Sequence, residues 1–143
     1  MKINDLVHSK IARGPKLSCA WPWTGGVYNF GDGEIVIAYT KKPCAYQGYE
    51  DILHGEAQAQ LVLRRSLDGG QTWPEELRQV VCDNQMPFDE WIQQGEQPQQ
   101  VDMSGKDAMF WRSFSRDPWL TADGRLAYQP ITFAMRSTDR GYH

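Results

Sequence analysis

The sequence lacks the features that mark several large classes of protein. Its 143 residues contain no run of 18 apolar residues, the length that a membrane-spanning helix requires. The formal net charge of −3 gives no basic surface for nucleic acid. The start, Met1-Lys2-Ile3-Asn4, has no apolar core of a signal peptide. We therefore expect no membrane contact and no nucleic-acid partner. The cytoplasm is the default location, unless a longer parent protein is secreted or exported to the periplasm.

Paired cysteines and clustered metal ligands are also missing. The cysteines are Cys19, Cys44 and Cys82, and the histidines are His8, His54 and His143. The cysteines are odd in number and widely spaced, and the histidines add no metal-ligand spacing. We expect buried free thiols, no metal and no cofactor.

Aromatic residues and turn signals, by contrast, are plentiful. Aromatics make up 12% of the chain and include six tryptophans, which suits an all-β protein with packed sheets. Short strand-like runs separated by Gly and Asp turns are predicted at residues 27–30, 34–40, 61–66 and 73–81, and again at 110–115, 119–120, 125–131 and 132–136. Residues 1–26 are ambiguous, since 3–11 fit either a short helix or an extended arm.

The segment 66–73 reads Ser-Leu-Asp-Gly-Gly-Gln-Thr-Trp and predicts a hairpin turn. Asp-Gly is a strong hairpin signal because the turn needs backbone angles that glycine adopts easily. The Ser66 hydroxyl and the Asp68 carboxylate can accept hydrogen bonds from the amides of the turn. Trp73 offers a large ring to cover it.

The end of the chain repeats this pattern. Residues 136–143 read Arg-Ser-Thr-Asp-Arg-Gly-Tyr-His, which matches Arg65-Ser66-x-Asp68-x-Gly70. The two aspartates, Asp68 and Asp139, are 71 residues apart. That spacing is of the order of one propeller blade with long loops, since compact repeats take roughly 40–50 residues. Arg65 and Arg136 hold equivalent positions, and we expect each to be ion-paired or stacked.

The pattern Ser-x-Asp-x-Gly-x-Thr-Trp resembles the Asp-box repeat of the sialidase-like β-propellers. The matching residues are Ser66, Asp68, Gly70, Thr72 and Trp73, and in the second copy Ser137, Asp139 and Gly141. The resemblance implies a partial six-bladed propeller of about two four-stranded antiparallel blades, in which the boxes are structural. A closed ring needs more chain than this, so we expect a piece of a larger reading frame, or else a ring completed by copies of the same chain.

The implied organisation has four parts. Residues 1–26 form an N-terminal arm, 27–82 the first blade with its box at 66–73, 83–107 a long polar loop, and 108–143 a second blade that stops within its box. The first blade carries about 20 extra residues at 41–60, and loops of this length are usually functional or disordered.

The resemblance to sialidases implies a catalytic aspartic acid on that insertion, and Asp51 matches its place in chain order. Raising the pKa of Asp51 would require burial under aromatics such as Tyr46 and Tyr49. His54 and Glu56 compete for the same proton-transfer role. A solvated loop with no chemistry is the alternative.

The family also binds the substrate carboxylate with arginines, because their fork matches it. Arg13-Gly14-Pro15 is the nearest match to the first family arginine. The second is replaced by Lys41 and Lys42, which act as point charges. Arg112 and Arg116, with Phe110 and Phe114, alternate along one strand and could contact a sugar, or form ion pairs within a blade interface.

Two functions follow from the resemblance. The first is part of a sialidase-like glycoside hydrolase that acts on terminal sugars of glycoconjugates. The family's nucleophile, a tyrosine paired with a glutamate, comes from later blades, so this chain alone is expected to be inactive. The second is a non-catalytic Asp-box module that binds carbohydrate or protein. Exposed blade edges are expected to promote self-association.

Overall fold

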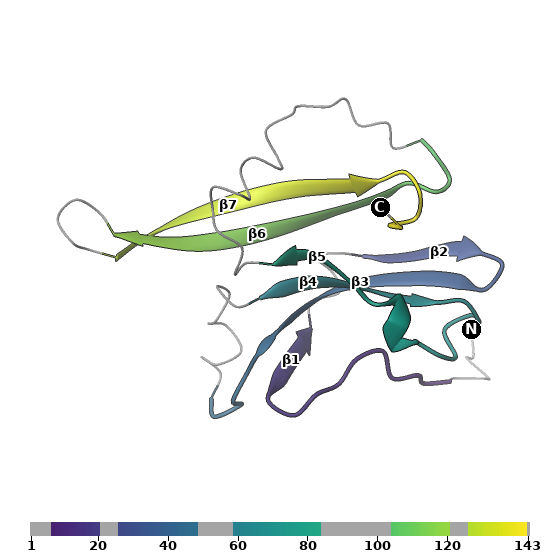
Figure 1. The fold of residues 1–143 in the computed structure, drawn as a ribbon, viewed down its shortest axis with the longest axis horizontal. Coiled ribbons are helices and arrows are strands. Elements are labelled where there is room, and N and C mark those ends of the chain that lie inside the picture. Colours follow the sequence, from purple (N-terminus) through teal and green to yellow (C-terminus); the bar gives the residue numbers. More distant parts are fainter. Residues whose placement is uncertain (1–6, 21–25, 49–58, 84–103, 121–125, 143) are drawn as a thin grey trace, which may run out of the picture.

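The computed structural model describes residues 7–20, 26–48, 59–83, 104–120 and 126–142, and for 111–120 and 126–134 it describes the backbone alone. These residues form two antiparallel β-sheets, one above the other in Figure 1, and a single short 3-10 helix, η2. The predicted all-β class is confirmed. No helix in these ranges is long and apolar enough to cross a lipid bilayer.

The first sheet has five strands. They are β1 (Leu17–Ala20), β2 (Val27–Gly31), β3 (Glu34–Pro43), β4 (Gln60–Ser66) and β5 (Gln79–Asp83). The order is β1-β3-β4-β5, and β2 also pairs with β3. β2 pairs with the first half of β3 and β1 with the second half, from Thr40 to Pro43, so the two short strands lie end to end along one edge of β3.

Two elements of this sheet differ from the sequence-based expectation. β1 lies within residues 1–26, which were expected to be an arm, because the length of β3 offers it a second pairing partner. The strand expected at 73–81 is shorter, since Pro74 is followed by η2 (Glu75–Leu77) and pairing begins only at Gln79. Pro74 cannot donate a backbone hydrogen bond, but its carbonyl accepts one from Leu77 (3.3 Å).

The second sheet is a long hairpin of β6 (Met109–Leu120) and β7 (Leu126–Ser137). Its register is unbroken from Met109 opposite Ser137 to Leu120 opposite Leu126. The sequence was expected to form several short strands here, and instead two long strands form. The described residues therefore contain a five-stranded and a two-stranded sheet, which differs from the expected pair of four-stranded blades.

The hydrophobic core lies between the two sheets. Alternate residues of β3 and β4 face the hairpin, which contributes Met109 and, at the margin, Met135. The buried cluster is Val36, Ala38, Leu61, Leu63, Cys82 and Met109. All three cysteines are free of disulfides; Cys44 and Cys82 are buried as expected, and Cys19 is half-buried. Burial raises the pKa of the Cys19 thiol, against the opposing charge of Lys41.

Candidate functional site

The turn after β4 is closed by its own side chains, as the sequence predicted. The Ser66 hydroxyl accepts hydrogen bonds from the amides of Asp68 (3.3 Å) and Gly70 (2.8 Å) and donates to Asp68 Oδ1 (2.7 Å). The Asp68 carboxylate in turn accepts from the Thr72 amide (2.9 Å) and the Thr72 hydroxyl (2.6 Å). The indole of Trp73 donates to Gly70 O and to Ser9 Oγ, both at 3.1 Å.

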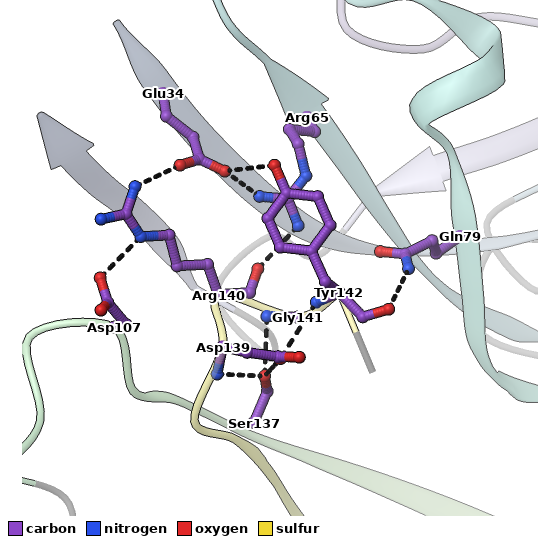
Figure 2. Close-up of polar contacts among 9 residues, drawn as sticks. All are labelled: Glu34, Arg65, Gln79, Asp107, Ser137, Asp139, Arg140, Gly141 and Tyr142. Carbon is purple, nitrogen blue, oxygen red and sulfur yellow. Dashed lines mark hydrogen bonds and ion pairs between the residues drawn. The ribbon is translucent and has the colours of Figure 1, made fainter. Parts of the chain in front are cut away.

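The turn after β7 closes in the same way. The Ser137 hydroxyl accepts from the amides of Asp139 (3.2 Å) and Gly141 (2.7 Å) and donates to Asp139 Oδ1 (2.5 Å). The Tyr142 amide donates to the same carboxylate oxygen at 3.2 Å. Figure 2 shows this second closure. The repeated sequence pattern therefore corresponds to a repeated hydrogen-bond pattern.

The match extends to the backbone. Gly69 and Gly70 have φ of 74° and 87°, and the equivalent Arg140 and Gly141 have φ of 62° and 78°. The amide of Gly69 donates to Gly33 O (2.8 Å), just as the amide of Arg140 donates to Asp107 O (2.9 Å). Each turn is thus fastened to the backbone just before the neighbouring strand of its own sheet, one residue before β3 at Gly33 and two residues before β6 at Asp107.

A charged cluster joins the second turn to the first sheet, and this is the candidate site of the described residues (Figure 2). The side chains of Arg65 and Glu34 are only 2% and 9% exposed, and Arg65 Nη1 donates to Glu34 Oε1. Arg140 Nη1 donates to Glu34 Oε2 (2.5 Å), and the Tyr142 hydroxyl donates to Glu34 Oε1 (3.1 Å). Both oxygens of one carboxylate are therefore occupied.

The two arginines of the cluster make further contacts across the sheets. Arg65 Nη2 donates to Arg140 O (2.7 Å), and its guanidinium carbon lies 3.9 Å from the centre of the Tyr142 ring. Arg140 Nε donates to Asp107 Oδ1 (2.6 Å), and its guanidinium group lies over Phe30. Two positive and two negative groups thus compensate one another in a partly buried setting.

The electrostatics follow from these contacts. Burial alone would raise the pKa of Glu34, but hydrogen bonds from Arg140, Arg65 and Tyr142 outweigh it and leave that pKa lowered. The hydrogen bond with Glu34, and then that with Asp107, raises the pKa of Arg140. Glu34 is therefore ionised at neutral pH. The arrangement holds charges in place and does not supply a proton donor.

The cluster was found only in part from the sequence. Arg65 was expected to be ion-paired or stacked, and it is both. Arg140 and Tyr142 were missed because they occupy the variable positions of the repeated turn. The place of Glu34 in the cluster could have been predicted from the sequence. Glu34, Val36 and Ala38 are alternate residues of one strand, so an acidic side chain at position 34 faces the same side as the apolar core and needs a partner there.

Most of the residues predicted to bind or transform a substrate lie outside the described residues or in strands described by their backbone alone. Asp51, His54 and Tyr49 lie outside the described residues. Arg13 is exposed in the segment before β1. Arg112 and Arg116 occupy β6 positions opposite Ala134 and Pro130, in the part described by its backbone alone.

No group of three or more His, Cys, Asp or Glu side chains within the described ranges could hold a metal ion. Comparisons with protein-family models, with curated proteins and with solved structures find no match for this chain.

Proposed function

We propose that the chain forms adjacent repeat units of a sialidase-like β-propeller, part of a glycoside hydrolase that acts on terminal sugars of glycoconjugates. The observation that carries this proposal is the repetition of the Ser66–Asp68 closure at Ser137 and Asp139, together with the docking of the second turn on the first sheet. A repeated turn closure, with the second turn fastened to the first sheet, favours a radially repeated sheet architecture.

In this proposal the boxes are structural, and the chemistry belongs to other residues. Asp51 is the candidate acid, with His54 as its competitor and Tyr49 as aromatic cover. Arg13, Arg112 and Arg116 are the candidate contacts for an anionic or neutral sugar. Since the nucleophile of such enzymes comes from later blades, the 143 residues alone bind without turnover.

The test is hydrolysis of a panel of 4-methylumbelliferyl glycosides, sialosides included, by the gene product read to its natural stop codon. We expect one glycoside to be cleaved, and Asp51→Asn to lower kcat by at least a hundredfold with an unchanged thermal unfolding midpoint. Asp68→Asn is the matched control, because it should lower stability and leave the kcat of the folded fraction unchanged. Absence of turnover on the whole panel would remove the hydrolase assignment.

The second candidate is a non-catalytic Asp-box module that binds carbohydrate or protein. It is favoured by Lys42, which stands near the place of a family arginine and is only 3% exposed. A buried lysine does not offer the planar fork that binds a sugar carboxylate. Retention of glycans on an array without hydrolysis of any glycoside would support the module, and hydrolysis would exclude it.

A further inference from the structure

The two sheets correspond residue by residue near their turns. Ile35 of β3 lies opposite Ser66 of β4, and Met109 of β6 lies opposite Ser137 of β7. Since both serines begin an equivalent turn, Met109 is the counterpart of Ile35. The neighbouring positions of the two hairpins follow in the same register, so each residue beside one turn can be compared with its counterpart beside the other.

The two sheets pack through opposite faces. In the first sheet, Val36 and Leu63 belong to the buried cluster, whereas Ile35 precedes Val36 and faces the other side of the strand. In the second sheet the residue that enters the cluster is Met109, the counterpart of Ile35. A Cβ on Gly141 of the second turn would lie close to both Met109 and Leu63. The face of the second sheet that carries its turn therefore docks on the opposite face of the first sheet, which makes the packing heterologous.

The surface of the first sheet that receives the second turn includes Phe30, Glu34 and Arg65. Glu34 accepts hydrogen bonds from Arg140 (2.5 Å) and from the Tyr142 hydroxyl (3.1 Å), as Figure 2 shows. The guanidinium group of Arg65 lies over the Tyr142 ring, and that of Arg140 lies over Phe30. Counted from the serine, Arg140 and Tyr142 are the fourth and sixth residues of the turn. Side chains at these two positions, which differ between the two turns, thus join the sheets.

The first turn has neither of these side chains. Its fourth residue is Gly69, where a Cβ would have no described neighbour within 4 Å. Its sixth residue is Gln71, whose side chain donates to Asp68 O of the same turn (3.0 Å). The first turn is fully closed, yet it offers no group that could replace Arg140 or Tyr142. Closure of a turn and docking of a turn are therefore separate properties.

The receiving positions differ between the sheets as well. The counterpart of Arg65 is Arg136, but the counterpart of Glu34 is Ala108. The side chain of Ala108 accepts no hydrogen bond, so an arginine at the fourth position of a turn would find no carboxylate at this place on the second sheet.

We propose that the fourth and sixth residues of each turn select the sheet on which that turn docks. The first sheet presents a carboxylate beside an arginine, and it fits a turn with a cation at the fourth position and a tyrosine at the sixth. The repeat units are therefore not interchangeable, because a turn without these side chains leaves a buried carboxylate short of partners. This selection does not depend on whether a parent protein hydrolyses a glycoside, so the two proposals can fail independently.

Hydrogen exchange of the Phe110 amide tests the selection, since this amide donates across the two sheets to the Tyr28 hydroxyl (3.2 Å). The test variant, Arg140→Gly with Tyr142→Gln, gives the second turn the residues of the first and keeps its closure. We expect Phe110 exchange to rise at least tenfold, while exchange of the Ala38 amide, which is bonded within the first sheet (3.1 Å), changes less than threefold. An unchanged Phe110 amide, or an equal rise at Ala38, would overturn the proposal.

The matched control is Gly69→Arg with Gln71→Tyr, which gives the first turn the residues of the second. An arginine is compatible with this backbone, because Arg140 has φ of 62° and Gly69 has φ of 74°. We expect Phe110 exchange to stay within twofold of the unmodified protein, since a side chain at Gly69 does not point at the junction of the sheets. A rise equal to that of the test variant would count against selection by these positions.

A double-mutant cycle separates docking from effects within the second turn, where Arg140 also binds Asp107 (2.6 Å). Arg140→Met should raise Phe110 exchange at least fivefold in the unmodified protein. The same change should raise it no more than twofold in a Glu34→Gln background, where the charge of its partner is already gone. These replacements remove charge with little change in side-chain length, so the cycle is informative even where the paired turn variant does not fold. Equal effects in both backgrounds would assign Arg140 to its own turn alone and refute the selection.

Discussion

The guanidinium group of Arg65 lies over the ring of Tyr142, 3.9 Å from its centre. Arg65 directly precedes the turn that begins at Ser66, and Tyr142 belongs to the equivalent turn of the second sheet, so this contact links the two sheets. Arginine stacks on aromatic rings with the face of its guanidinium group, and its N–H groups remain free to form hydrogen bonds in the plane of that group. Here those hydrogen bonds reach Glu34 and the carbonyl of Arg140. One side chain thus links three segments that are distant in sequence.

Replacement of Arg65 by methionine should therefore be among the most destabilising single changes. We expect Arg65→Met to lower the free energy of unfolding by about 3 kcal/mol, because it leaves the buried Glu34 without one of its partners. Urea denaturation measures the change. Arg78→Ala is the control: it breaks an exposed ion pair with Glu75, whose side chain is 71% exposed, and should cost less than about 1 kcal/mol. Equal losses in the two variants would contradict the role of the cluster.

Removal of the hydroxyl that closes each turn should have similar consequences in both. Each of Ser66 and Ser137 satisfies two turn amides from a buried position, at 0% and 4% exposure. We expect Ser66→Ala and Ser137→Ala each to lower the free energy of unfolding by about 1–3 kcal/mol, since partly or fully buried amides lose their acceptor. A clearly smaller loss at Ser137 would show that the second turn does not depend on the same closure.

The two turn glycines should differ in their tolerance of a methyl group. Gly70 and Gly141 have similar φ values, 87° and 78°, so alanine is strained at both. A Cβ at Gly141 would come within 3.0 Å of Leu63 and 3.2 Å of Met109, whereas at Gly70 its nearest neighbour is 3.6 Å away. Gly141→Ala should therefore cost about 1–2 kcal/mol more than Gly70→Ala in thermal or urea unfolding. Equal losses of unfolding free energy in the two variants would mean that backbone strain alone, and not crowding against Leu63 and Met109, determines the effect.

Acid should destabilise the fold through two carboxylates. Hydrogen bonds from the Thr72 hydroxyl, the Thr72 amide and Ser66 lower the pKa of Asp68 to about 2, and the pKa of Glu34 is also lowered. Between the ordinary pKa of a carboxyl group and the lowered pKa in the folded protein, these carboxylates bind protons in the unfolded chain but not in the folded protein. Its stability therefore falls as the pH decreases from about 5 towards 2.

The measurement is the urea midpoint between pH 7 and pH 2.5. We expect a plateau above pH 5 and a steady decline below it. Asp68→Asn should lower the midpoint at pH 7 and flatten the decline below pH 4. A midpoint that rises on acidification would contradict the assigned shifts.

The sequence predicted the local structure better than the long-range structure. The Asp68–Gly70 turn and its repeat at Asp139 were legible because both the hydrogen-bonding side chains and the glycines lie within a few residues. The strands β2, β3 and β4 were also found close to their true positions, from their alternation and flanking turns. The all-β class follows from these elements.

What the sequence did not reveal depends on contacts between distant residues. β1 forms because β3 continues past Thr40 and offers a second partner, which no local pattern signals. The hairpin of β6 and β7 is continuous because Pro118 and Pro130 both fall where no hydrogen bond is needed, although each proline alone suggests a break. The partners of Arg65 lie on another strand and another turn, so only its need for a partner was predictable.

The self-contained closure of the first turn has a practical consequence. Since Ser66 and Asp68 satisfy the amides around them, Leu67 contributes no side chain to the closure and remains 55% exposed. The tip of this turn is therefore a suitable attachment point for a fluorophore or a grafted epitope.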